Sequence, residues 1–149
     1  MKRVNSILLI SGLLSLSSFA LGAENYFSCS TSKGELSLQS NSDQLVYEMK
    51  NANGKVFSFS SASPAYSDFL YNHYSRYQTD YINVAFTKYN FKYTVFSNYE
   101  DGESTKGVTV TNLKNNREYT YNCKGEGVDK LSDLISKLQC DKGSSLGCQ

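Results

Sequence analysis

His73 is the only histidine in this chain of 149 residues, so any chemistry that needs an imidazole must use it. Asp68, five residues earlier, could orient the ring, but covalent catalysis also requires a reactive cysteine or serine within hydrogen-bond reach of the base. The cysteines all follow an N-terminal segment typical of exported proteins, and we expect them to be oxidised rather than present as thiolates. The sequence therefore predicts a protein that is not an enzyme, with His73 at the surface or in a packing role.

The densest acidic cluster consists of Glu100, Asp101 and Glu103. Paired carboxylates can cleave glycosides, but they must flank a cleft, and one of them is usually desolvated. A calcium loop would need alternating oxygen ligands and a terminal glutamate, and the cluster has neither at the required spacing. We therefore expect residues 98–104 to form a solvated turn. No metal site or cofactor is predicted, because one histidine and these cysteines lack the short paired spacing of zinc ligands.

Tyrosine is the strongest compositional bias, with twelve tyrosines and no tryptophan. Most of them suit the strands of a β-rich domain, where aromatic residues are enriched. The segment from residue 61 to residue 81 holds more aromatic residues than a simple connection needs, and tyrosine and arginine are common at the centres of protein interfaces. Two interpretations remain open: a surface that contacts a protein or glycan, or a satellite packing cluster. The predicted binding residues are Tyr66, Tyr71, His73, Tyr74, Arg76 and Tyr77.

An even number of cysteines in an exported chain indicates disulfides, and four cysteines allow three pairings. We favour Cys29 with Cys123, and Cys140 with Cys148. The first bond would tie the opening strand to the last one and close a loop of roughly 95 residues, a constraint of about 4 to 5 kcal/mol in the chain-entropy model. The second would close a short tail. The rival pairing joins Cys29 to Cys148 and Cys123 to Cys140.

The first residues follow the pattern of a secretion signal: Lys2 and Arg3, an apolar run over 7–21, and small residues before Glu24. We expect residues 1–23 to be cleaved, which leaves a single disulfide-stabilised domain over 24–149 in the periplasm, or secreted beyond it. The apolar run is interrupted by serines and is shorter than the ~20 residues that span a bilayer, so no stable membrane anchor is expected. Loss of the signal leaves one more acidic than basic residue, and this balance argues against nucleic-acid binding.

From residue 25 onward apolar residues mostly alternate with polar ones, and turn residues recur at short intervals. This pattern predicts a mainly β fold: an antiparallel barrel or sandwich of seven to eight strands, with a central hairpin over 82–95. Apolar residues at three- and four-residue spacing predict one C-terminal amphipathic helix over 128–138. Residues 61–79 suit either a helix or an ordered loop with a helical turn.

The first strand carries Tyr26-Phe27-Ser28-Cys29, the middle is a hairpin rich in tyrosine and phenylalanine, and the last strand ends at Cys123. Over residues 25–125 the chain thus resembles the small periplasmic β-barrel proteins of the lysozyme-inhibitor type, and it is similar to uncharacterised exported β-proteins of Gram-negative bacteria. The resemblance implies a Ser-Gly-x-x-Tyr loop that enters the lysozyme cleft. The nearest counterpart is Ser63-Pro64-Ala65-Tyr66, in which proline replaces glycine and one residue fewer precedes the tyrosine.

Together these features predict a non-enzymatic periplasmic protein that binds another protein. The partner would be a cell-wall hydrolase that the chain inhibits, or a secreted toxin against which it acts as an immunity protein. In both cases residues 61–81 would cover an active-site cleft. The alternative is a glycan- or ligand-binding module of the envelope that uses the same tyrosines as a stacking surface.

Overall fold

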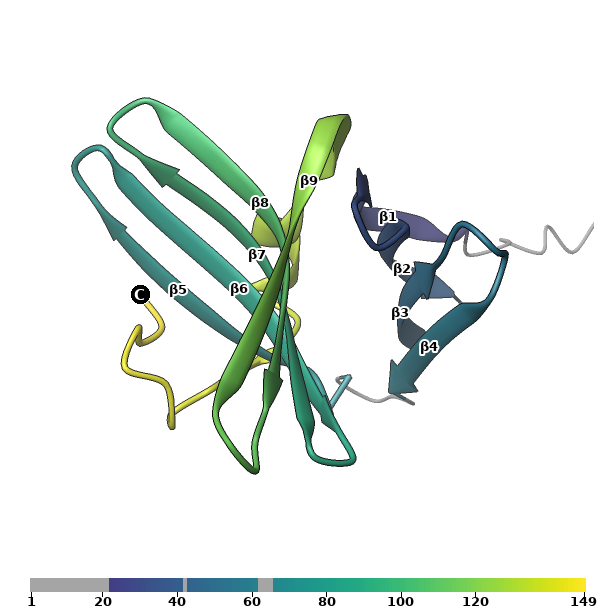
Figure 1. Cartoon of the computed structure of the whole chain (residues 1–149). Coiled ribbons are helices and arrows are strands. Elements are labelled where there is room, and N and C mark those ends of the chain that lie inside the picture. The colour runs from purple at the N-terminus through teal and green to yellow at the C-terminus, as the bar shows by residue number, and fades with distance from the viewer. Residues whose placement is uncertain (1–21, 42, 62–65) are drawn as a thin grey trace, which may run out of the picture.

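A computed structural model describes residues 22–41, 43–61 and 66–149 of the chain. The described residues form one ten-stranded sheet in the order β10-β5-β6-β7-β8-β9-β1-β2-β3-β4 (Figure 1). The strands are β1 (Glu24–Thr31), β2 (Glu35–Asn41), β3 (Gln44–Lys50), β4 (Val56–Ser61), β5 (Leu70–Arg76), β6 (Thr79–Lys88), β7 (Phe91–Glu100), β8 (Glu103–Asn112), β9 (Arg117–Asp129) and β10 (Gln139–Cys140).

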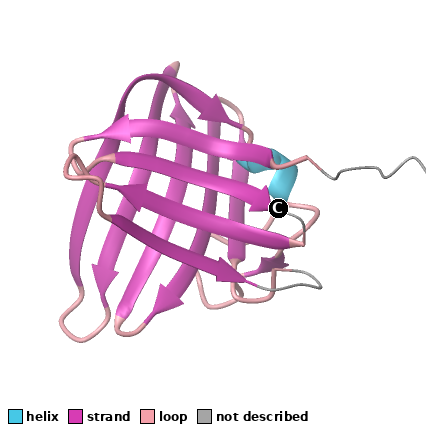
Figure 2. Cartoon of the chain, turned by 90° about the vertical axis from the view of Figure 1, so that its right-hand side faces the viewer, coloured by secondary structure: helices cyan, strands magenta, loops and turns pink. Residues whose placement is uncertain are grey.

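The sheet curls into a half-barrel, so that β1–β4 pack over β5–β9 (Figure 1). Figure 2, viewed from the β1–β4 side, shows the strands of this layer running across those of the layer behind. All neighbouring strands are antiparallel except β10 and β5, which makes the sheet mixed. The edge strand β4 is linked to the other layer by a side chain, because the Lys88 ammonium at the end of β6 donates a hydrogen bond to the Ser58 carbonyl of β4 at 3.1 Å.

Strand β9 carries the chain from one layer to the other. Its first half pairs with β8 and its second half with β1, where the register shifts between Ser28 and Ser30. A Cβ atom at Gly127 would lie 2.2 Å from the Ser28 carbonyl oxygen, so a glycine is needed where the two strands approach this closely. The local bulge bends β9 and lets a single strand serve both layers.

The alternating residues of the strands meet on one inner face, as the sequence predicts. The cross-strand rows Val84, Val95 and Val108 and Phe86, Tyr93 and Val110 run through the centre of that face. The central hairpin is confirmed as β6 and β7. The largest fully buried side chains are Tyr26, Phe27, Leu36, Leu38, Leu45, Tyr47, Phe69, Val84, Val95, Val108, Leu131 and Leu134.

The predicted C-terminal helix over 128–138 is wrong. Strand β9 continues to Asp129, with Val128 paired to Ser28, and is followed by the 3-10 turn η1 (Leu131–Leu134); the described residues contain no α-helix. The apolar spacing reflects burial of Leu131 and Leu134, which are three residues apart and both 0% exposed. Residues at this spacing eclipse one another in a 3-10 turn, so a single turn buries both against the core.

The strand count was also too low, because β5 and β10 were not predicted. Residues 70–76 form strand β5 rather than a helix or a loop. Their aromatic and polar residues show no clean alternation because both faces of β5 are in contact with other parts of the chain: Tyr71 packs on the core, while Asn72 is buried on the opposite face. Strand β10 has two residues and leaves no periodic signal.

Both favoured disulfides are confirmed: Cys29–Cys123 spans 94 residues, and Cys140–Cys148 spans 8. No cysteine of the described chain is free. Two disulfides indicate an oxidising, extracytoplasmic environment. Among the described residues there is no helix with the length and apolar character needed to cross a membrane.

Candidate functional site

The hairpins β5–β6 and β7–β8 extend side by side beyond the β1–β4 layer (Figure 1). Asp101 and Gly102 both have positive φ, as the two-residue turn of a hairpin requires. The Asp101 amide donates a hydrogen bond to the Gln78 carbonyl at 2.9 Å, so the two turns are joined. We call residues 74–81 and 98–105 the hairpin tips.

The predicted binding residues divide into two groups. Tyr66 and Tyr71 are partly buried and pack against the hydrophobic core, so they contribute to folding rather than to an open surface. Ser63, Pro64 and Ala65, which complete the counterpart of the lysozyme-inhibitor loop, lie outside the described residues. Tyr74, Arg76 and Tyr77 lie at the hairpin tips, and His73 lies directly below them on β5.

His73 is held between two partners. Its Nε2 atom lies 2.8 Å from a carboxylate oxygen of Asp80, and its Nδ1 atom lies 2.7 Å from the main-chain oxygen of Gln149. Asp68, which the sequence suggested as an orienting residue, instead contacts Ser61 through its side chain and its amide. Because both ring nitrogens are engaged, neither is available to take a proton from a nucleophile in this arrangement.

Arg76 lies beside one of the tyrosines of the tips. The guanidinium group lies 5.9 Å from the centre of the Tyr74 ring, in the range of a cation–π contact. The Tyr74 and Tyr81 rings lie 6.2 Å apart on the outer face of the sheet. Tyr77 stands at the turn itself and is 88% exposed. The tips therefore present aromatic area and a cation to solvent.

The acidic turn lies beside these tyrosines. The hydrogen bond from the Tyr81 hydroxyl to Glu100 raises the pKa of that hydroxyl above its usual value. A shallow hollow of the outer face is lined by Tyr81, Asn98, Glu100, Asp101, Glu103 and Thr105. No group of three histidine, cysteine or acidic residues in the described part of the chain is placed to hold a metal ion. The solvated turn expected over 98–104 is confined to Asp101 and Gly102, between the ends of β7 and β8, and it forms one wall of a mixed aromatic and acidic surface.

Between the hairpin tips and the core, the inner face of the sheet is polar. Ser97 donates a hydrogen bond to Asp129 at 2.6 Å, and Lys106 forms an ion pair with the same carboxylate at 3.1 Å. These side chains hold the end of β9 against β7 and β8 beside the base of the tips. They give the projecting hairpins a fixed position relative to the core.

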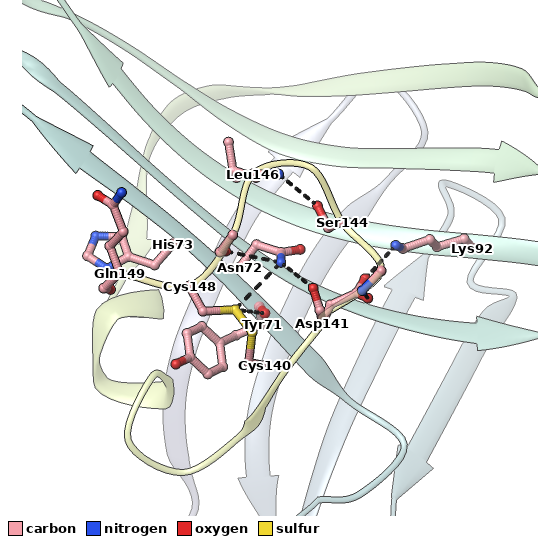
Figure 3. Close-up of a disulfide and its surroundings, with 12 residues drawn as sticks. Tyr71, Asn72, His73, Lys92, Cys140, Asp141, Ser144, Leu146, Cys148 and Gln149 are labelled. Atoms are coloured by element: carbon pink, nitrogen blue, oxygen red, sulfur yellow. Dashed lines mark hydrogen bonds and ion pairs between the residues drawn. A yellow bond between two sulfur atoms is a disulfide. The ribbon is translucent and has the colours of Figure 1, made fainter.

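The C-terminal tail, residues 141–149, covers the free edge of β5 (Figure 3). Asn72 is 4% exposed and donates from its side-chain amide to the carbonyls of Asp141 and Gly147, at 3.1 and 3.2 Å. Lys92 of β7 forms an ion pair with Asp141 at 2.9 Å, and this hydrogen bond holds the pKa of the Asp141 carboxyl below its usual range. The tail thus closes one edge of the sheet and leaves the tips free.

The sequence separated the tyrosine-rich segment from the acidic turn, and the structure brings them together. Asn98 and Thr105 had no sequence signal of their own. Their position follows from the pairing of β6 with β7 and of β7 with β8, which places the two turns at the same end of the sheet. No protein-family model, curated protein or solved structure matches this chain.

Proposed function

We propose that this chain is an exported, non-enzymatic protein that binds a protein partner through its hairpin tips. The partner is a cell-wall hydrolase that it inhibits, or a toxin against which it confers immunity in the periplasm. One observation carries the proposal: two hairpins joined by the Asp101–Gln78 hydrogen bond project past the β1–β4 layer with Tyr77 almost fully exposed. A joined pair of tips loses little conformational freedom when a partner binds, and this favours affinity.

The chemistry of the tips indicates the kind of partner. Tyrosine and arginine are the residues that most often dominate protein interfaces, and Tyr74, Arg76 and Tyr77 supply both. Glu100, Asp101 and Glu103 add negative charge next to them. The surface therefore complements a cationic rim around a cleft, and the electrostatic match would speed association. Inhibition would be steric, with the tips inserted into the cleft.

Two further features support a binding role in the envelope. Both nitrogens of the only histidine are engaged by Asp80 and Gln149, and the cysteines that the structure describes form disulfides. The N-terminal pattern of residues 1–23 fits a cleaved secretion signal, and the disulfides fit the oxidising periplasm.

The sharpest experiment compares two tyrosines at opposite ends of the same hairpin strand. Tyr77 and Tyr89 flank β6, stand at hairpin turns, and are 88% and 85% exposed. The oxidised protein is immobilised and used to capture partners from periplasm and from the secretions of competing bacteria. Tyr77→Ala should weaken capture of a specific hydrolase or toxin by about tenfold or more, while Tyr89→Ala should leave it unchanged. Equal capture by both variants would contradict the proposal.

A glycan-binding function is the second candidate, and the Tyr74–Tyr81 pair favours it. These rings lie on the outer face beside the amide of Asn98 and the carboxylate of Glu100, a combination that can stack on a sugar and hydrogen-bond its hydroxyls. Peptidoglycan fragments should then bind, and Tyr74→Ala with Tyr81→Ala should abolish binding. Retained sugar binding in that double variant would exclude this surface.

A further inference from the structure

A second candidate site lies at the other end of the sheet, away from the hairpin tips. It is an apolar pocket on the inner face, between β3 and β4 on one side and β7, β8 and β9 on the other. Tyr93, Val110 and Tyr119 form one cross-strand row of its wall, and Met49 and Phe57 form another. The lining residues are Lys33, Tyr47, Met49, Phe57, Tyr93, Val110, Tyr119 and Tyr121.

The walls of this pocket are rigid before any ligand arrives. Four rings form a continuous stack in the order Phe59, Phe86, Tyr93 and Phe57, with centroid distances of 4.3, 4.9 and 4.9 Å. The Lys88 ammonium lies 5.0 Å from the centre of the Phe57 ring at the end of the stack. Stacked aromatic rings in a packed core keep their rotamers, so Phe57 and Tyr93 present a preformed surface.

The polar groups of the pocket point to a ligand. Tyr47 is 1% exposed and is one of the residues that line the pocket. Burial raises the pKa of that hydroxyl, and the neighbouring Tyr93 and Tyr121 raise it further. Tyr47 therefore stays protonated and can donate a hydrogen bond. An acceptor atom of a ligand in the pocket could take this hydrogen bond.

The lining contains one cation and no carboxylate. Lys33, in the exposed turn between β1 and β2, is among the lining residues, whereas no aspartate or glutamate is. The cavity volume is about 200 Å³, below the ~300 to 1,000 Å³ typical of drug-sized ligands. The site therefore suits a small molecule with an apolar body and one anionic group.

We propose that this pocket binds a single-ring aromatic monocarboxylate, with its ring against Met49, Phe57 and Val110, its carboxylate accepting a hydrogen bond from the Tyr47 hydroxyl, and Lys33 supplying the compensating charge. The inference does not depend on the hairpin tips, because none of the tip residues lines the pocket. The chain would thus carry a ligand site within the half-barrel and a partner surface outside it.

Phenylacetate is a suitable probe, and phenylacetamide is its uncharged counterpart. Titration of the oxidised, isotope-labelled protein should give saturable amide shifts at Tyr47, Met49 and Val110, with a Kd of about 1 mM or tighter, and no shift at Asn98. Phenylacetamide should bind about tenfold more weakly, because it lacks the charge that strengthens a hydrogen bond.

Two conservative variants test the named contacts. Tyr47→Phe removes a hydroxyl and keeps the ring, and it should weaken phenylacetate binding about tenfold; Tyr99→Phe at the hairpin tips is the matched control. Lys33→Gln should weaken binding about threefold, compared with Lys114→Gln in another exposed turn. Shifts that do not saturate, shifts centred elsewhere, equal affinity for the amide, or undiminished binding in Tyr47→Phe would each overturn the proposal.

Discussion

The two ends of strands β6 and β7 differ, although the same inner face runs along both. At one end the inner positions are Phe86, Tyr93 and Val84, which pack beneath the β1–β4 layer. At the other end the inner positions are Asp80 and Ser97, which extend beyond that layer at the base of the hairpin tips. The change from apolar to polar residues marks where the covering layer ends.

This difference indicates where stability is located and, under the proposed function, where a partner would bind. Packed aromatic rings at the covered end supply cohesion and enclose a small pocket. The projecting end is held by a few polar contacts, and its exposed residues can vary without opening the core. A protein that binds through a surface gains from this separation, because changes that tune the surface leave the fold intact.

The largest expected effect tests the covered end. Phe86 is 3% exposed, and its ring lies 4.3 Å from that of Phe59 and 4.9 Å from that of Tyr93. Phe86→Ala should lower the free energy of unfolding by about 3 to 5 kcal/mol, because it removes the centre of the ring stack and leaves a cavity. Urea unfolding of the oxidised protein measures this loss.

Asp80→Ala is the matched change on the same strand at the other end. The His73–Asp80 pair is partly exposed, with side-chain exposures of 18% and 42%. Its loss should cost about 1 kcal/mol or less. If the two variants lost similar stability, the distinction between a cohesive end and a projecting end would fail.

An effect smaller than that of Phe86→Ala concerns the tail that covers the β5 edge. Replacing Cys140 and Cys148 with serine opens a short loop, and the chain-entropy model gives a loss of about 2 to 3 kcal/mol. The loss should be confined to the tail and β5. Hydrogen exchange should therefore rise at the His73 amide, which donates a hydrogen bond to the tail, and at the Gln149 amide, which donates one to β5. Amides of β2 and β3 serve as the control. A uniform rise across both layers would show that the tail supports the whole fold.

Much of this architecture was predictable because most strands bury one face only. Leu36 and Leu38, or Ile82 and Val84, alternate with polar residues and define their strands without further information. Strand β5 was not predictable, because the tail covers its outer face at Asn72 while the core covers Tyr71. A strand that is in contact on both faces loses the alternation of apolar and polar residues that would mark it in the sequence.

The candidate surface was predictable from the sequence only in part. Tyr74, Arg76 and Tyr77 stand out in the sequence, but only the strand register shows that the acidic turn at Asp101 lies beside them. The aromatic pocket was not predicted, because its residues come from five strands and a turn that are far apart in the sequence. Spacing within one segment cannot reveal a site of that kind.

The smallest effect is a pH dependence at the tail. The hydrogen bond from Lys92 lowers the pKa of the Asp141 carboxyl in the folded protein, so the contact contributes stability above the ordinary carboxyl pKa of about 4. That contribution is lost as the pH falls through the lowered folded value, while between pH 5 and 8 it stays constant. Titration of the Asp141 side-chain carboxyl by NMR should show the lowered pKa, and Lys92→Met should move it back toward the ordinary value. An unchanged pKa in that variant would mean that the Gly143 amide, 3.1 Å from the other carboxylate oxygen, holds the charge instead, and that the tail is fixed to β5 alone rather than to the central strand β7.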